Sequence, residues 1–186
     1  LVLAGEGVQV PDGRGHQLDI AGLVKGAAEG EGLGNKFLSH IRDTDAIAQV
    51  VRVFEDPDIT HVAGAPNPVA DIEVLEYELI LKDLETVSAR LASLQKEAKA
   101  GRKGADEEAA TLGTVQTALR TGATSDYRGF ASIVKELQLL TSKPCIYIFN
   151  VSERQLHDGW KPPPDLEKKV NSASYVTISA QIESEL

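Results

Sequence analysis

Three short polar segments of the sequence each follow an apolar run, and their side chains could act together. They are Asp19-Ile-Ala-Gly22, Asn150-Val-Ser-Glu153 and Ser179-Ala180. An aspartate can hold Mg²⁺ through water, and the N–H of a nearby glycine can bind a terminal phosphate. An Asn-x-x-acid pair can contact the edge of a base, with a Ser-Ala turn behind it. Each segment alone is also a common turn sequence, so the interpretation depends on a fold that brings the three together.

A cluster of five glycines lies between Gly22 and Gly34. Glycine loses more backbone freedom on folding than any other residue, so a cluster of this density needs a reason. One reason is a set of backbone N–H groups that close around a phosphate, and the other is a flexible linker. The composition of the cluster leaves both open.

Apolar strands alternate with amphipathic helices in the first and last thirds of the chain. A short strand is also expected around residues 8–10, and a loop over 150–165. A buried strand is expected at 46–55, a fully apolar strand at 144–150 and a further strand at 175–179, with helices at 35–43, 130–140 and 166–172. This alternation predicts an α/β fold with a mainly parallel sheet, whose ligands bind beyond the carboxyl ends of the strands.

The middle of the chain has the pattern of a helical hairpin, over about residues 71–121. Its first half has apolar residues at the heptad period, and glycines interrupt the pattern at 100–106. A weaker apolar stripe follows, so we expect two antiparallel helices that cover each other. The first stripe consists of Ile80, Leu84, Val87, Leu91, Leu94 and Ala98, and the second of Ala105, Ala109, Leu112 and Leu119.

The composition of the 186-residue chain excludes or disfavours several classes of protein. Hydrophobic residues make up 42% of it, which is enough for a core, and the net charge of −9 disfavours binding of nucleic acid except at a local basic patch. Cys145 is the only cysteine, which excludes an internal disulfide, and we expect it to be a buried small hydrophobe. No apolar run approaches the roughly 20 residues of a membrane helix. We therefore expect a cytoplasmic protein without membrane contact.

Several segments together resemble the YchF/Obg-like ATPases, from about Asp19 to Leu186. They read DIAGLVKGAAEGEGLGNKFLSHIRDTDAI, FEDPDITHV, DIEVLEYELILKDLETV, LTSKP and NVSE. The resemblance implies a P-loop, GTPase-type nucleotide-binding domain with an inserted helical coiled-coil arm. The first part of that domain is expected at 1–70, the arm at 71–128 and the second part at 129–186.

The resemblance also implies a function: ATP binding and hydrolysis, with GTP as a second nucleotide, Mg²⁺ as cofactor, and a role at the ribosome in translation or in stress response. It implies that Asp19 holds the metal and that the Gly22 N–H binds a terminal phosphate, while Gly26 to Gly34 form a mobile loop. The residues it places around the base are Asn150, Val151 and Glu153, with Ser179 and Ala180 behind them.

Glu153 gives the expected preference for ATP a physical form. GTPases have Asp at this position, and its short carboxylate accepts two hydrogen bonds from the guanine edge. Because Glu is one methylene longer, its carboxylate cannot occupy the same place. A base without that pair of donors is then rejected less strongly.

Leu23 and Gln49 are the residues that the resemblance assigns to hydrolysis. Many GTPases have a glutamine that orients water after D-x-x-G, whereas this family has an apolar residue, here Leu23. Family members usually have a histidine on the strand after it, and this sequence has Gln49 at that place. Glutamine can orient water but cannot accept a proton near neutral pH. His40 is expected to be structural.

The largest departure from the family is an absent motif, because no G-x-x-x-x-G-K-[ST] occurs in the chain. We expect a fragment without the P-loop and without the small β-rich domain that follows in family members. Such a chain should bind ATP poorly and hydrolyse it negligibly. The alternative is a non-catalytic remnant that binds a partner protein or the ribosome.

Four basic residues lie together at the predicted end of the hairpin: Lys96, Lys99, Arg102 and Lys103, with Glu97 as the one acid among them. This patch could contact phosphates of ribosomal RNA. It could equally be the solvated end of a hairpin.

Overall fold

The computed structural model describes residues 2–4, 41–42, 44–55, 67–123, 130–171 and 175–184. The chain divides into two compact units: residues 1–73 with 144–186, and residues 74–143. The expected strand at 8–10, the glycine cluster, and Asp19, Leu23 and His40 lie outside the described residues. Of the expected helix at 35–43, only Ile41 and Arg42 are described, and both are helical.

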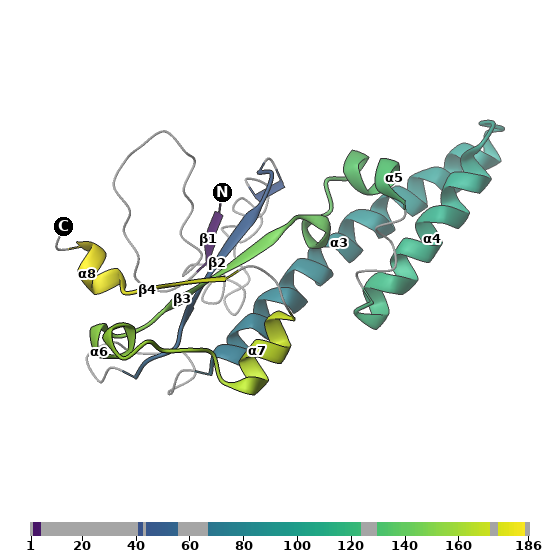
Figure 1. Cartoon of the computed structure of the whole chain (residues 1–186). Coiled ribbons are helices and arrows are strands. Elements are labelled where there is room, and N and C mark those ends of the chain that lie inside the picture. Colours follow the sequence, from purple (N-terminus) through teal and green to yellow (C-terminus); the bar gives the residue numbers. More distant parts are fainter. Residues whose placement is uncertain are drawn as a thin grey trace, which may run out of the picture. The chain divides into compact units, whose positions relative to one another are not determined.

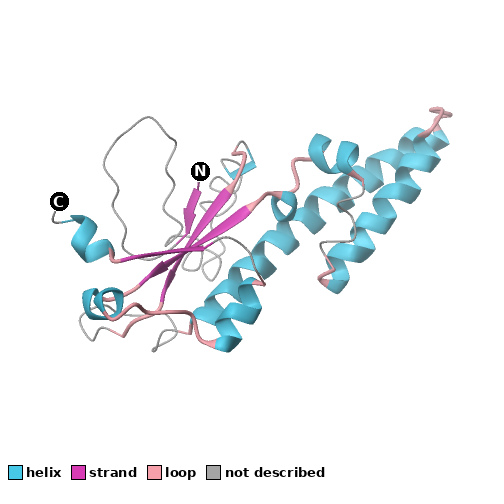
Figure 2. Cartoon of the chain, in the orientation of Figure 1, coloured by secondary structure: helices cyan, strands magenta, loops and turns pink. Residues whose placement is uncertain are grey.

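The first unit contains a parallel sheet with the strand order β1-β2-β3-β4 (Figures 1 and 2). Its strands are β1 (Val2–Ala4), β2 (Ile47–Arg52), β3 (Cys145–Asn150) and β4 (Tyr175–Ile178). Of the four strands expected from the sequence, the three on described residues are confirmed as β2, β3 and β4, and the parallel α/β fold with them. β2 ends at Arg52, three residues before the expected end at 55. β1 has only three residues and was not expected, because a run of that length carries no readable periodicity.

The core of this unit lies between the sheet and two helices. α7 (Pro164–Val170) contributes Leu166 and Val170, and the first turns of α3 (Pro68–Lys99) contribute Ile72. They pack with Phe149 of β3, which is fully buried and contacts Trp160 edge to face at 5.5 Å between ring centroids. β2 is buried along almost its whole length, as expected for a central strand of a parallel sheet.

The second unit is a helical hairpin of α3 and α4 (Ala105–Thr121). Four of the buried residues at its centre belong to the two predicted stripes, namely Val87, Leu94, Leu112 and Leu119, with Ile80, Leu84, Leu91 and Ala109 packed against them. The other buried residues of this core are outside the predicted stripes: Val115, Ala118, Val134 and Leu139. The turn between the helices passes through Gly101 and Gly104, at φ of 82° and 84°. Only glycine adopts this left-handed conformation without strain, which explains the glycines at the predicted break.

The expected helix at 130–140 is shorter in the structure. α5 (Ala131–Glu136) ends before Gln138, which has a φ of 49°, and the 3₁₀ helix η2 (Leu140–Ser142) follows. The Asp83 carboxylate accepts the N–H groups of Leu140 and Thr141, both at 2.8 Å. A side chain 57 residues away therefore binds donors that a longer α5 would have used.

Residues 150–165, expected to form a loop, contain the short helix α6 (Glu153–His157). Ser152 and Gln155 form a capping box at its start, in which the Ser152 hydroxyl accepts the Gln155 N–H and Gln155 Oε1 accepts the Ser152 N–H. Two residues after β4 lies the last described helix, α8 (Ala180–Ser184). Within the described ranges, no helix has both the length and the apolar character to cross a membrane.

Candidate nucleotide-binding site

The carboxyl ends of β3 and β4 bring two of the three polar segments together. Asn150 is the last residue of β3, and its register partner on β4 is Ile178, directly before Ser179. The Ala180 N–H donates to Asn150 Oδ1 at 3.0 Å, and the Val151 N–H donates to the Ile178 carbonyl at 2.8 Å. Two segments 30 residues apart in sequence thus share one edge of the sheet, which is where parallel α/β sheets bind ligands.

Burial at this edge is high for polar side chains. Asn150 is 8% exposed and Ser179 is 1% exposed. The Asn150 amide is oriented by Ala180, whereas Ser179 Oγ has no hydrogen-bond partner within the part of the chain that the structure describes. A buried hydroxyl without a partner costs about 1–3 kcal/mol. Ser179 Oγ is therefore a polar group whose bonding is incomplete at the predicted base site.

The start of α6 fixes the segment that carries Glu153. Ser152 caps the helix, and Gln155 Nε2 donates to the Val53 carbonyl at 3.4 Å, which ties α6 to the chain after β2. Glu153 is the first residue of α6 and is exposed. Gln155 was not singled out from the sequence, although S-x-x-Q before a helix is a readable capping signal.

Arg52 is the residue of β2 that aligns with Asn150. Its guanidinium donates to the Phe54 carbonyl at 3.0 Å and lies over the Phe54 ring at 4.8 Å from the centroid. The guanidinium of Arg52 therefore lies at the same edge of the sheet, where its contacts with Phe54 fix its position.

Gln49, the predicted hydrolytic residue, lies further along β2. It pairs in register with Tyr147, three residues before the Arg52–Asn150 pair, and it is 5% exposed. Three residues of a strand span about 10 Å. The structure therefore places Gln49 inside the sheet rather than at the edge with Asn150.

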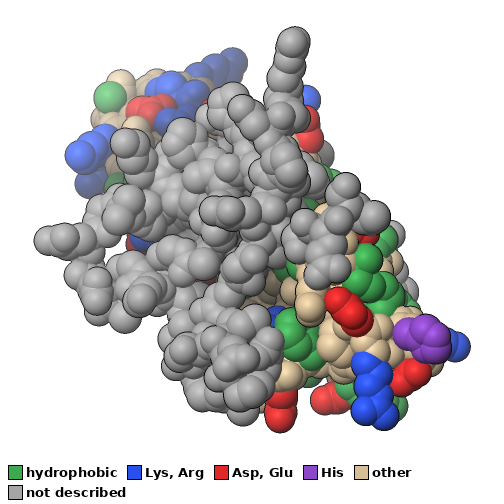
Figure 3. Space-filling model, turned by 90° about the vertical axis from the view of Figure 1, so that its left-hand side faces the viewer, with side chains coloured by type: hydrophobic (Ala, Val, Ile, Leu, Met, Phe, Trp, Pro, Cys, Tyr) green, Lys and Arg blue, Asp and Glu red, His purple; other side chains and the backbone are tan. Residues whose placement is uncertain are grey.

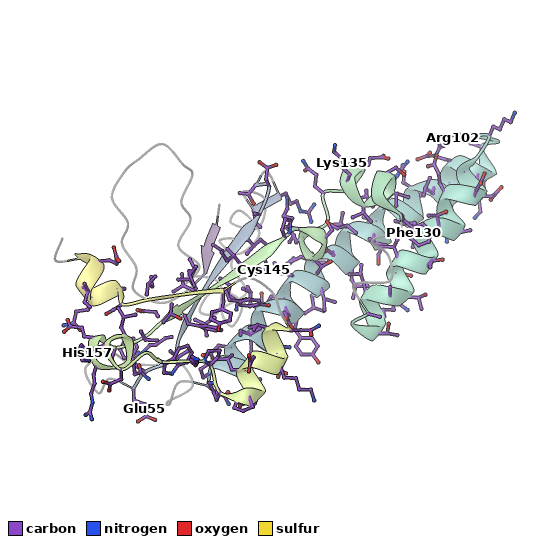
Figure 4. All side chains as sticks on the ribbon, in the orientation of Figure 1. Glu55, Arg102, Phe130, Lys135, Cys145 and His157 are labelled. Carbon is purple, nitrogen blue, oxygen red and sulfur yellow. The ribbon has the colours of Figure 1, made fainter. Side chains whose placement is uncertain are left out.

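The remaining predicted site residues are not described. Asp19, Gly22 and Leu23 lie outside the described residues, so the predicted metal ligand has no described geometry. Among the described residues, no group of three or more His, Cys, Asp or Glu side chains could hold a metal ion. Cys145 is half-buried at the amino end of β3, the end opposite Asn150 (Figure 4).

The surface around α6 has charges of both signs, with acidic and basic side chains beside a histidine (Figure 3). Asp158 pairs with His157 at 3.4 Å and with Arg154 at 3.7 Å, and the side chains of all three are mostly exposed. Exposed pairs of this kind contribute little to stability. The charged side chains beside α6 are therefore not needed to hold this helix in place.

Comparisons with known proteins agree with the fold. The chain is 44% identical over 176 residues to the ribosome-binding ATPase YchF of Bacillus subtilis, across 90% of this chain and 48% of that protein. It is 45% identical over 145 residues to Obg-like ATPase 1 of Saccharomyces cerevisiae, across 73% of this chain and 37% of that protein. No protein-family model matches the chain.

A solved structure shows the same architecture. The YchF GTPase of Schizosaccharomyces pombe matches with a TM-score of 0.71 and 36% identity, over 91% of this chain and 49% of that one. The chain thus spans about half the length of the Bacillus and Schizosaccharomyces relatives. From the strand order, the inserted hairpin and these matches, the chain belongs to the YchF/Obg-like ATPase family, and its α/β fold is that of a P-loop, GTPase-type domain.

Proposed function

We propose that this chain forms most of a nucleotide-binding domain that takes ATP and, more weakly, GTP at the carboxyl edge of β3 and β4. The observation that carries the proposal is the hydrogen bond from the Ala180 N–H to Asn150 Oδ1. It joins the two segments on either side of the proposed base. The incomplete bonding of Ser179 Oγ supports the same place, because a bound base or its water would supply the partner.

Each residue of the edge has a distinct role in this proposal. Asn150 and Val151 form the wall beside the base, with Ser179 and Ala180 behind it. Glu153 contacts the base edge from the first turn of α6. Its longer side chain keeps the carboxylate from the position that reads the two guanine donors, so ATP is accepted.

The phosphate end of the site depends on residues outside the described ranges. We propose that Gly22 binds the terminal phosphate through its N–H and that Leu23 lies near the attacking water. Gln49, which is buried within β2, would act on that water only from inside the sheet. Asp19 would hold Mg²⁺ through water, and the ion would neutralise phosphate charge. In this plan the two parts of the nucleotide domain are 1–70 and 129–186, and the arm is 71–128.

The absent G-x-x-x-x-G-K-[ST] motif sets the expected affinity. Charge-assisted bonds to phosphate contribute about 1.5–3 kcal/mol each, so two or three missing bonds weaken binding by several decades. We therefore expect the 186-residue chain to bind ATP in the millimolar range and to hydrolyse it negligibly.

The test measures nucleotide binding to the chain by ligand-observed NMR at millimolar ATP or GTP. Calorimetry would measure any tighter binding. Asn150→Ala should remove the saturation-transfer signal of the base protons. Glu153→Asp should raise GTP binding relative to ATP by about tenfold, because the shorter carboxylate can accept both guanine donors. Asp165→Asn, an exposed acid on α7, is the matched control and should change neither.

Two results would contradict the proposal. Unchanged base signals in Asn150→Ala would remove the site from this edge. A micromolar affinity for ATP in the unmodified chain would overturn the expected weakness.

A second candidate function is contact with the ribosome through the arm, without nucleotide turnover. The Bacillus relative is named a ribosome-binding ATPase. At the hairpin turn, where Figure 4 labels Arg102, the exposed side chains of Lys96, Lys99 and Lys103 make no ion pair within the described residues. These three lysines are the groups that would meet RNA phosphates.

A further inference from the structure

The first half of α3 has exposed apolar side chains on the side away from its buried ones. Val74, Tyr77 and Leu81 are 45%, 67% and 58% exposed, and together we call them the α3 stripe. Their spacing of three and four residues places them on one helical face, over about 10 Å of helix length. Tyr77 and Leu81 are the two most exposed large hydrophobic residues among those described.

The buried side chains of the same segment follow a different line. Ile72, Leu75 and Leu79 are between 0% and 9% exposed. In a helix they lie on roughly the opposite side from Val74 and Leu81. A surface helix of a globular protein has one apolar stripe, and a second one on the opposite side indicates a second partner.

The charges around the α3 stripe indicate what this partner is. Glu78 and Glu85 follow Val74 and Leu81 by four residues, so they share its face. Over residues 71–85 there are six acids and one base, and one acid, Asp83, is fully buried. Lys82 pairs with Glu85 at 3.0 Å, and the other exposed or half-buried charges of the segment are carboxylates. The apolar stripe therefore has an acidic border.

We propose that the α3 stripe is a docking surface for a basic amphipathic helix of a partner protein. The apolar ridge of that helix would cover Tyr77 and Leu81, and its flanking Lys or Arg residues would meet Glu78 and Glu85. RNA is disfavoured because its phosphates would face this acidic border. A second copy of this chain is disfavoured for the same reason, since two identical acidic borders would face each other. This surface is separate from the proposed nucleotide site and does not depend on it.

The test uses a labelled synthetic peptide of about 18 residues, or five helical turns. It consists of Leu and Lys, with Leu at helical i, i+3, i+4 and i+7 spacing, and binding to the 186-residue chain is followed by fluorescence anisotropy. A peptide of the same pattern with Glu in place of Lys is the charge control. We expect the Leu/Lys peptide to bind and the Leu/Glu peptide not to bind.

Variants then separate the stripe from general attraction to an acidic protein. Tyr77→Ser with Leu81→Ser should weaken binding of the Leu/Lys peptide by at least about tenfold, as loss of a central apolar contact does. Leu156→Ser removes a partly exposed apolar side chain on α6 and should change nothing. Glu78→Lys with Glu85→Lys should reverse the preference toward the Leu/Glu peptide. All variants change side chains that are not fully buried, and circular dichroism checks their folding.

The proposal is wrong if the double serine variant binds the Leu/Lys peptide as tightly as the unchanged chain. It is also wrong if both peptides bind alike. A dimer in sedimentation velocity that the serine substitutions dissociate would make the stripe a contact between copies and would equally overturn it. Asn150→Ala should leave peptide binding unchanged, so failure of this inference and failure of the nucleotide site are distinguishable.

Discussion

At the scale of single residues, Asp83 is a buried carboxylate with three hydrogen bonds to a distant segment of the chain. Its carboxylate is fully buried and accepts the Leu140 N–H and the Thr141 N–H at 2.8 Å and the Thr141 hydroxyl at 2.7 Å. A buried carboxylate is costly unless its oxygens are hydrogen-bonded, and here both of them are. Asp83 thereby attaches α3 to η2 within the second unit.

We predict that Asp83→Asn lowers the free energy of unfolding by about 3 kcal/mol. The substitution keeps the volume, but it replaces an accepting oxygen by an NH₂ group that faces donors, and a lost bond to a charged group costs about 1.5–3 kcal/mol. Urea denaturation measures the change. Glu85→Gln, on the exposed side of α3, should stay within about 0.5 kcal/mol of the unchanged chain. Equal stability of the two variants would contradict the role given to Asp83.

A residue near the site can be predicted from the sequence when the pattern that indicates its place lies in its own sequence neighbours. The position of Asn150 and Ser179 at one edge could be predicted because each lies at the end of an apolar strand, and parallel strands end at one edge. Ser152 and Gln155 were missed although their capping signal is local. The role of Asp83 could not be predicted, because a carboxylate on an acidic helix gives no sign of partners 57 residues away.

At the scale of elements, the turn of the arm is organised by ion pairs. Glu97 accepts from Arg90 at 2.9 Å and from Arg102 at 2.6 Å, and Glu108 of α4 also pairs with both arginines. The hydrogen bond from the Ser93 hydroxyl, followed by the charges of Arg90 and Arg102, lowers the pKa of Glu97. The ionised form is thus favoured in the folded arm.

We predict that Glu97→Gln destabilises the arm at neutral pH and much less in acid. A carboxyl with a lowered folded-state pKa contributes stability above its ordinary pKa, and this contribution is lost as the pH falls through the lowered value. Denaturation of both proteins from about pH 7 to about pH 2 should therefore show a difference that shrinks with acidity. The control is Glu107→Gln, since Glu107 makes no ion pair within the described residues. A difference independent of pH would show that the pairs are not its origin.

Whether a helix or strand could be predicted depends on the length and regularity of its apolar pattern. The arm helices and the three longer strands could be predicted, since several turns or residues of one period agree. α6 has five residues, too few for a periodic signal. α5 ends before Gln138 although the helical spacing of apolar residues continues to Leu140, so its early end could not be predicted from that spacing. β1, with three residues, is recognised only by its pairing with β2.

At the scale of the whole molecule, charge decides where nucleic acid could bind. The net charge is −9, and residues 96–108 contain four basic and four acidic side chains, because the first turn of α4 adds Asp106, Glu107 and Glu108 to the turn. Arg102 is held by Glu97 and Glu108. The four-residue basic patch expected from the sequence is therefore reduced to Lys96, Lys99 and Lys103, which are exposed and have no ion pair with any residue that the structure describes.

We predict that reversing these three lysines together, Lys96→Glu, Lys99→Glu and Lys103→Glu, removes co-sedimentation of the chain with purified ribosomes at low salt. Each lost phosphate contact also reduces the salt dependence of binding by about one unit of slope. The matched control is Lys135→Glu, Lys161→Glu and Lys168→Glu, three exposed lysines outside the turn. Both triple variants change the net charge by the same amount, so only a local contact distinguishes them. Equal loss in both would assign ribosome binding to total charge, and no loss in either would exclude the arm turn as the contact.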